Sequence, residues 1–199
     1  ELDRFKGVEP DAYDDADVSG VISVIGPLAE TSVLTEALLR SDRFDNIDGR
    51  MRPDSLPDFA GETISAFFDL ANAPYYGYFR SMNEDYVREI AAESAVEAVN
   101  GRCYANPFDH EGKTEKRKAK AIMFSSSLMS GYGYDDVRML FEESGKEICV
   151  IAPLQSAFGD IFSRDDNVSA IGVWADIETI ASGVYGLVSE KEAEKYGAG

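Results

Sequence analysis

The strongest constraint on the fold of this chain is the alternation of short apolar runs with segments of helical periodicity. Residues 21–25 and 148–152 are almost continuously apolar, which is typical of strands buried on both faces of a parallel sheet. Parallel strands need crossover connections, which are commonly helices and almost always right-handed. The sequence therefore predicts an α/β fold with a mostly parallel sheet flanked by helices.

The apolar runs and the helical periodicity give an expected range for each element. The predicted strands cover residues 18–28, 63–70, 121–127, 147–154 and 168–175. The predicted helices cover residues 32–40, 83–101, 134–145, 156–164 and 176–197. Ligands of such folds bind beyond the carboxyl ends of the strands, so functional residues are expected where each strand ends.

The remaining segments predict a domain organisation. Residues 1–20 hold seven acidic and two basic residues and few core-forming side chains, so we expect an extended acidic arm. Residues 41–62 contain prolines, glycines and acids without periodicity, which predicts a surface insertion. We accordingly expect a first α/β domain over 21–120, carrying that insertion, and a partial second α/β domain over 121–199.

Charge limits the partners of the chain. The formal net charge is −18, with 37 acidic against 19 basic residues, so nucleic acid and anionic lipid would meet a surface of their own sign. The basic run at 113–120 is short and is expected to be solvated. No apolar run reaches the length of about 18 residues that spans a membrane. We therefore expect protein partners with basic surfaces, no nucleic acid and no membrane insertion.

Cysteine content and the start of the chain bear on its location. The two cysteines, Cys103 and Cys149, are too few for a disulfide framework and are expected to be ordinary thiols. The sequence begins at Glu1 and shows no apolar targeting segment. We expect a soluble protein of the cytoplasm, or of an organelle stroma or matrix after removal of a presequence.

Several classes of active site lack their usual residues. His110 is the only histidine and lies in a predicted loop, and no nucleophile elbow surrounds a serine, which disfavours a Ser-His-Asp hydrolase. The glycines near residue 131 lack the spacing of a phosphate-binding loop. Acid pairs such as Asp135 and Asp136 are typical of helix starts rather than of metal sites. We expect neither a metal nor a cofactor.

Three consecutive serines mark the most distinctive corner of the sequence. Ser125, Ser126 and Ser127 follow an apolar run, and Gly131 and Gly133 come shortly after them. Small polar residues between a strand and a helix leave room for a ligand at the carboxyl edge of the sheet. This corner is therefore a candidate binding site.

Three segments, taken in chain order, resemble the glutamate racemases of the aspartate/glutamate racemase superfamily. The most specific is IGVWADIETIASGVY at 171–185, which is similar to a strand and helix of that family. The segment FFDLANAPYYG at 67–77 is similar to a second family motif, with Asp69, Ala71, Pro74 and Tyr75 in matching places. The segment VIGPLAETSVL at 24–34 is placed like the opening motif of the family.

The resemblance implies cofactor-free racemisation, in which two cysteine thiolates remove and return the α-proton of an amino acid. Ser125 stands at the position of the first cysteine, and a hydroxyl is far more basic than a thiol, whose pKa is about 8.5. Asn72 replaces the arginine of the family, and Gly26-Pro27 replace an Asp-Ser pair. The second cysteine motif has no counterpart before Gly199, and Cys149 lies inside a predicted strand.

The resemblance also implies where a vestigial ligand pocket would lie, with no catalytic residue in it. Its expected residues are Asp69, Asn72, Pro74, Tyr75, Ser125, Ser126, Ser127 and Thr179. The tyrosines of residues 75–78 either line this pocket or pack as an aromatic cluster.

The preferred hypothesis is a racemase-derived pseudoenzyme that serves as a structural or interaction subunit of a larger protein assembly. It rests on matching scaffold motifs without the proton-transfer residues. Two alternatives stay open: an amino-acid racemase-superfamily enzyme with altered chemistry, and a sensor of small dicarboxylates.

Overall fold

The computed structural model describes residues 20–77, 83–104, 106, 108–109, 111, 114–164 and 168–197. The acidic arm predicted over 1–20 lies outside these residues except for Gly20, and so do Tyr78 and His110. In the described part, no helix is long and apolar enough to cross a lipid bilayer.

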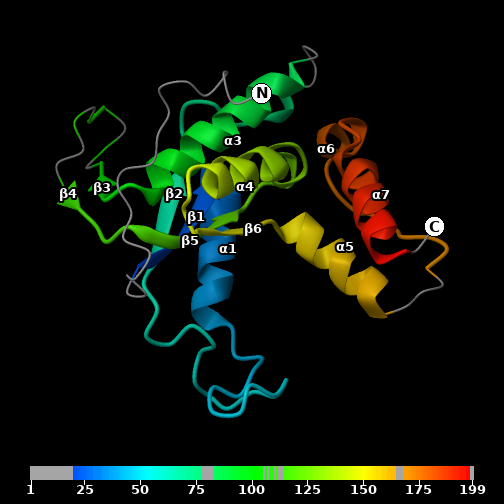
Figure 1. Cartoon of the computed structure of the whole chain (residues 1–199), viewed down its shortest axis with the longest axis horizontal. Helices are drawn as coiled ribbons and strands as arrows, with labels where there is room; N and C mark the ends of the chain where they lie inside the picture. The colour runs from blue at the N-terminus through cyan, green and yellow to red at the C-terminus, as the bar shows by residue number, and fades with distance from the viewer. Residues whose placement is uncertain are drawn as a thin grey trace.

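The core of the fold is a four-stranded parallel sheet, which confirms the predicted α/β class (Figure 1). Its strands are β1 (Val21–Gly26), β2 (Ile64–Phe68), β5 (Ala119–Phe124) and β6 (Cys149–Ile151), in the order β2-β1-β5-β6. Val24 of β1 lies opposite Ala66 on one side and Met123 on the other. Every residue of β1 is buried, as its continuous apolar run predicts.

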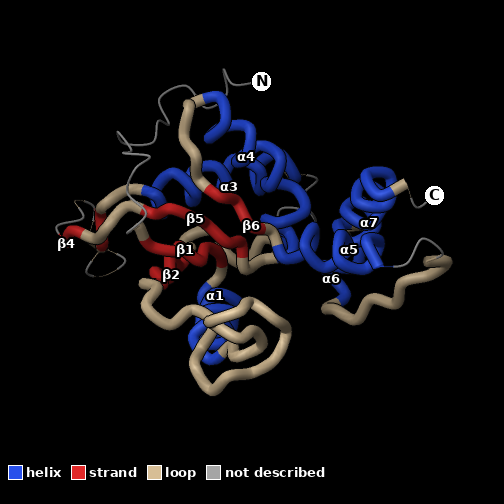
Figure 2. Tube along the Cα trace, turned by 60° about the horizontal axis from the view of Figure 1, so that its bottom comes forward, coloured by secondary structure: helices blue, strands red, loops and turns tan. Residues whose placement is uncertain are grey.

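Helices cover both faces of the sheet. Helix α1 (Leu28–Arg40) lies on one face, and α3 (Glu84–Val99) and α4 (Tyr134–Glu143) lie on the other (Figure 2). Burial differs between the two layers, since α3 buries nine of its side chains while α1 buries only Thr31. The hydrophobic core therefore lies mainly between the sheet and α3.

The C-terminal helices form a layer beside the sheet (Figure 1). The chain passes from β5 through a π-helix, η2 (Met129–Gly133), into α4. After β6 come α5 (Pro153–Arg164), α6 (Ile177–Ala181) and α7 (Val184–Tyr196), of which α5 and α7 pack together. A short antiparallel pair, β3 (Arg102–Cys103) and β4 (Thr114–Glu115), completes the described elements.

The strand predicted over residues 168–175 is wrong. These residues form neither helix nor strand, and Trp174 is 101% exposed. The apolar run suits a strand, but it connects α5 to α6 along the outside of the C-terminal helices (Figure 1). Its place in the tertiary structure therefore overrides its local preference.

The predicted division of the chain at residue 120 falls inside β5. Because β5 pairs with β1 on one side and β6 on the other, one sheet joins the segments that the sequence assigns to two domains. Residues 41–62 hold neither helix nor strand. The carboxylates of Asp42, Asp45 and Asp58 organise this loop by accepting hydrogen bonds from its backbone N–H groups.

Candidate functional site

The carboxyl ends of β1, β2 and β5 converge on Gly26. The backbone N–H of Asp69, which follows β2, donates to the Gly26 carbonyl at 2.9 Å. Gly26 has a φ of 147°, and a Cβ there would lie 2.3 Å from the Ser125 hydroxyl oxygen. Only glycine tolerates both conditions, so Gly26 allows the predicted pocket residues after β2 and β5 to approach each other.

Two contacts within the protein hold the Ser125 hydroxyl. Its Oγ lies 2.8 Å from the Oγ1 of Thr31 and donates to the carbonyl oxygen of Ile25 at 3.1 Å. Thr31 is fully buried in the first turns of α1. Neither neighbour is a base, so nothing in this geometry activates the Ser125 hydroxyl as a nucleophile or a proton acceptor.

Ser126 links the serine corner to a carboxylate that the sequence reasoning missed. The Ser126 side chain is buried and lies near enough to the Glu30 carboxylate, in the first turn of α1, to influence its pKa. The pKa of Glu30 is raised, first by desolvation and then by the nearby Asp176 carboxylate, while Ser126 opposes the shift. A sequence signal existed, because Glu30 follows a strand end and begins a helix, where functional groups of α/β folds lie.

Ser127 contacts the C-terminal helices, in which Thr179 lies. The hydroxyl groups of Tyr185 and Ser127 are 3.3 Å apart. Thr179 lies in α6, where its backbone N–H and its hydroxyl both donate to the Asp176 carboxylate at 2.7 Å. Asp176 is thus the N-cap of α6, and these hydrogen bonds lower its pKa.

The predicted residues after β2 form a compact polar turn. One carboxylate oxygen of Asp69 accepts from the backbone N–H and the side-chain amide of Asn72, at 3.0 and 3.1 Å. Its other oxygen accepts from the Tyr75 hydroxyl at 3.0 Å. Tyr75, which follows Pro74, is buried in the core, and Tyr76 packs partly against it. Both tyrosines therefore contribute to the hydrophobic core.

Polar groups of the predicted residues are engaged by hydrogen bonds within the protein. The hydroxyls of Ser125, Ser127 and Thr179 each have a hydrogen-bond partner in the protein. Cys149, an exposed thiol, is in β6 and not in the loop beyond it. Across the part of the chain that the structure describes, no three histidine, cysteine or acidic side chains cluster in a way that could hold a metal.

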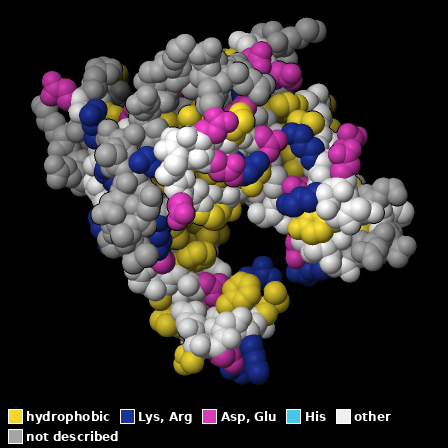
Figure 3. Space-filling model, viewed as in Figure 1, with side chains coloured by type: hydrophobic (Ala, Val, Ile, Leu, Met, Phe, Trp, Pro, Cys, Tyr) yellow, Lys and Arg dark blue, Asp and Glu magenta, His cyan; other side chains and the backbone are white. Residues whose placement is uncertain are grey.

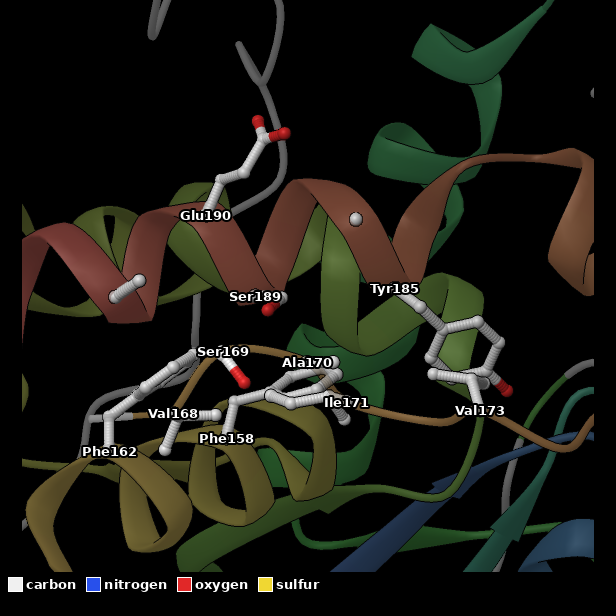
Figure 4. Close-up of a pocket in the computed structure, with 12 residues that line it drawn as sticks. Phe158, Phe162, Val168, Ser169, Ala170, Ile171, Val173, Tyr185, Ser189 and Glu190 are labelled. Atoms are coloured by element: carbon white, nitrogen blue, oxygen red, sulfur yellow. The ribbon is translucent and has the colours of Figure 1, made fainter. Parts of the chain in front are cut away.

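A cavity of about 440 Å³ lies on the other side of Tyr185, between α5 and α7 (Figure 4). Phe158 and Phe162 of α5 line one wall, and the 168–173 segment, including Ile171, lines another. The sequence did not predict this cavity, because the segment along its wall was assigned to the sheet.

The protein thus has an α/β fold, and at its serine corner the hydroxyls of Ser125 and Ser127 hydrogen-bond to other residues of the protein. Comparisons of the chain with protein-family profiles, with curated proteins and with solved structures find no match.

Proposed function

We propose that this protein is a racemase-derived pseudoenzyme that works as an interaction subunit of a larger assembly. The observation that carries the proposal is the bonding of Ser125. The resemblance aligns Ser125 with a catalytic thiol, and its hydroxyl hydrogen-bonds to Thr31 and to the Ile25 carbonyl, neither of which is a base. A group of this kind is unsuited to removing an α-proton, which favours binding over catalysis.

Exposed apolar residues beside the serine corner support a protein partner. We define the apolar rim as Leu28, Leu70 and Ile177, which are 52%, 52% and 76% exposed. Leu28 and Leu70 lie two residues beyond the ends of β1 and β2, and Ile177 follows Asp176. Apolar side chains next to a polar centre are typical of interaction surfaces. Figure 3 shows further apolar side chains at the surface beside the hollow between the 41–62 loop and the C-terminal helices.

Charge favours a basic partner. Glu30 and Asp176 are close enough for the Asp176 charge to raise the pKa of Glu30, and the chain as a whole carries a net charge of −18. A lysine or arginine of a partner would relieve this repulsion, whereas nucleic acid would add to it. A small dicarboxylate ligand is disfavoured for the same reason, because its two charges would meet these carboxylates.

The proposal is tested with an amphipathic lysine- and leucine-rich peptide as a probe of basic, apolar surfaces. Calorimetry should detect binding to the wild-type protein, weakening as salt is added. Replacing the three rim residues by serine should reduce the affinity at least about tenfold, which corresponds to about 1.4 kcal/mol.

Ile47→Ser is the matched control, since Ile47 is an equally apolar, 95% exposed residue in the 41–62 loop. If the rim variant and the control bind the peptide as well as the wild type does, the carboxyl edge is not the interaction surface.

A further inference from the structure

Residues 168–175 form a segment outside the helices and strands, and its backbone lacks strand partners. Within the described residues, no backbone–backbone hydrogen bond outside regular helices and strands involves this segment. The segment carries no charged side chain, and its Trp174 is fully exposed. Extended apolar backbone with open N–H and C=O groups is suited to pairing with a sheet edge.

The chain also presents a sheet edge of matching character. Strand β6 pairs with β5 on one side, and no strand of the described ranges pairs with it on the other. Its residues are Cys149, Val150 and Ile151, of which Cys149 is exposed and none is charged. In a β-α-β unit the strand that follows α5 would lie beside β6. Residues 168–175 follow α5, so this edge is the position that they leave unfilled.

Contacts of the C-terminal helices hold the segment away from its own β6. The side-chain amide of Gln155 in α5 donates to the Ser130 carbonyl of η2 at 2.7 Å. The Tyr132 hydroxyl donates to the carbonyl of Ser182, the C-cap residue of α6, at 2.6 Å. Both helices that flank the segment are thereby fastened to η2. Pairing within one copy would require these contacts to break, whereas pairing between copies would not.

We propose that residues 168–175 of a second copy of this chain add to β6 as a fifth strand. In a two-fold symmetric dimer each copy donates one segment and receives the other. The pairing surface is uncharged on both sides, so the net charge of −18 opposes the contact only at long range, and added salt should strengthen it. Trp174 would pass from solvent into the interface. This inference concerns a different surface from the apolar rim and does not depend on the proposed function.

The first test uses Trp174, which is the only tryptophan of the chain. Sedimentation velocity over a dilution series should show a monomer–dimer equilibrium, and tryptophan emission should shift to shorter wavelength over the same concentrations. Trp174→Glu should weaken dimerisation at least about tenfold, because it places a charge in the interface. Ile47→Glu, an equivalent change on the 41–62 loop, should leave it unchanged. A monomer at every concentration and salt level would overturn the proposal.

The second test uses Cys149 as a native reporter on β6. In a Cys103→Ser background, cysteine is introduced at residue 171, 172 or 173 in turn, and the protein is oxidised. At least one of these variants should form a disulfide-linked dimer on a non-reducing gel, and Trp174→Glu should suppress it. An internal disulfide in a sedimenting monomer would show pairing within one copy and would contradict strand exchange. Absence of any cross-link in all three variants would contradict it as well.

Discussion

The Ser125 hydroxyl lies 2.8 Å from the Thr31 hydroxyl, and this contact joins the end of β5 to the first turns of α1. Thr31 is the only side chain that α1 buries fully. The serine corner therefore positions a helix that otherwise packs weakly on the sheet.

Removing the Ser125 hydroxyl should destabilise the protein. Ser125→Ala leaves the buried Thr31 hydroxyl without its partner, which costs about 1–2 kcal/mol. The double variant Thr31→Val/Ser125→Ala removes both groups and should lose less than the sum of the single changes, by about 0.5–1.5 kcal/mol. Urea denaturation of the four proteins measures this coupling. Strictly additive losses would show that the two hydroxyls do not interact.

The ion pair between α3 and α4 should contribute more to the free energy of unfolding than any exposed ion pair. Arg88 donates to both carboxylate oxygens of Asp136, at 2.6 and 2.7 Å, and the Asp136 side chain is only 7% exposed. Arg88→Ala leaves the buried Asp136 carboxylate without this partner and should lower the free energy of unfolding by about 3 kcal/mol. Arg138→Ala, which breaks an exposed pair with Glu142, should cost about 0.5 kcal/mol or less. Equal losses in thermal or chemical unfolding would contradict this ranking.

Two glycine substitutions should have opposite effects. A Cβ on Gly131 of η2 would lie 2.0 Å from a methyl carbon of Val184, so Gly131→Ala should lose about 1–3 kcal/mol through overpacking against α7. Gly186 lies within α7 and faces open space, so Gly186→Ala should gain about 0.5–1 kcal/mol from helix propensity. Chemical denaturation measures both, and a tolerated Gly131→Ala would mean that α7 is not closely docked on η2.

Stability should depend on pH through Glu30. Desolvation and Asp176 raise the pKa of Glu30 in the folded protein above its value in the unfolded chain. Between those two values the folded state binds more protons, so stability falls as pH rises through this interval. Glu30→Gln should therefore be more stable than wild type at neutral pH, and the gain should vanish at pH values below the unfolded pKa.

Glu36→Gln controls for the loss of one charge, because Glu36 lies on the same helix and pairs on the surface with Arg40. Unfolding free energies of the three proteins across the acidic range give the comparison. A gain for Glu30→Gln that persists unchanged at low pH would have a cause other than proton binding.

The sequence predicted the parts of the fold that depend on local patterns. Mostly apolar runs located β1, β2, β5 and β6, and only β1 is buried along its whole length, as expected of a strand covered on both faces. The same pattern failed at residues 168–175, where the run is equally apolar but the chain path carries it away from the sheet. Apolar periodicity reports local preference and not whether a neighbouring edge is within reach.

The sequence predicted those site residues that directly follow a predicted strand. Ser125 to Ser127 and Asp69 follow apolar runs, so their convergence follows from the parallel arrangement. Glu30 was missed because one acid at a helix start is common among 37 acidic residues. Its environment depends on Ser126 and Asp176, which are distant in sequence. Likewise, the internal partners of the serine hydroxyls appear only when β1, β5 and α1 are assembled.

The most direct test of the central claim is exchange of the α-proton of amino acids. L- and D-glutamate and L- and D-aspartate are incubated with the purified protein in D₂O, and the α-proton signals are followed by NMR while chirality is followed by circular dichroism. The account predicts exchange no faster than in buffer and no change of chirality. Exchange or racemisation by the wild type that Ser125→Ala abolishes would contradict it.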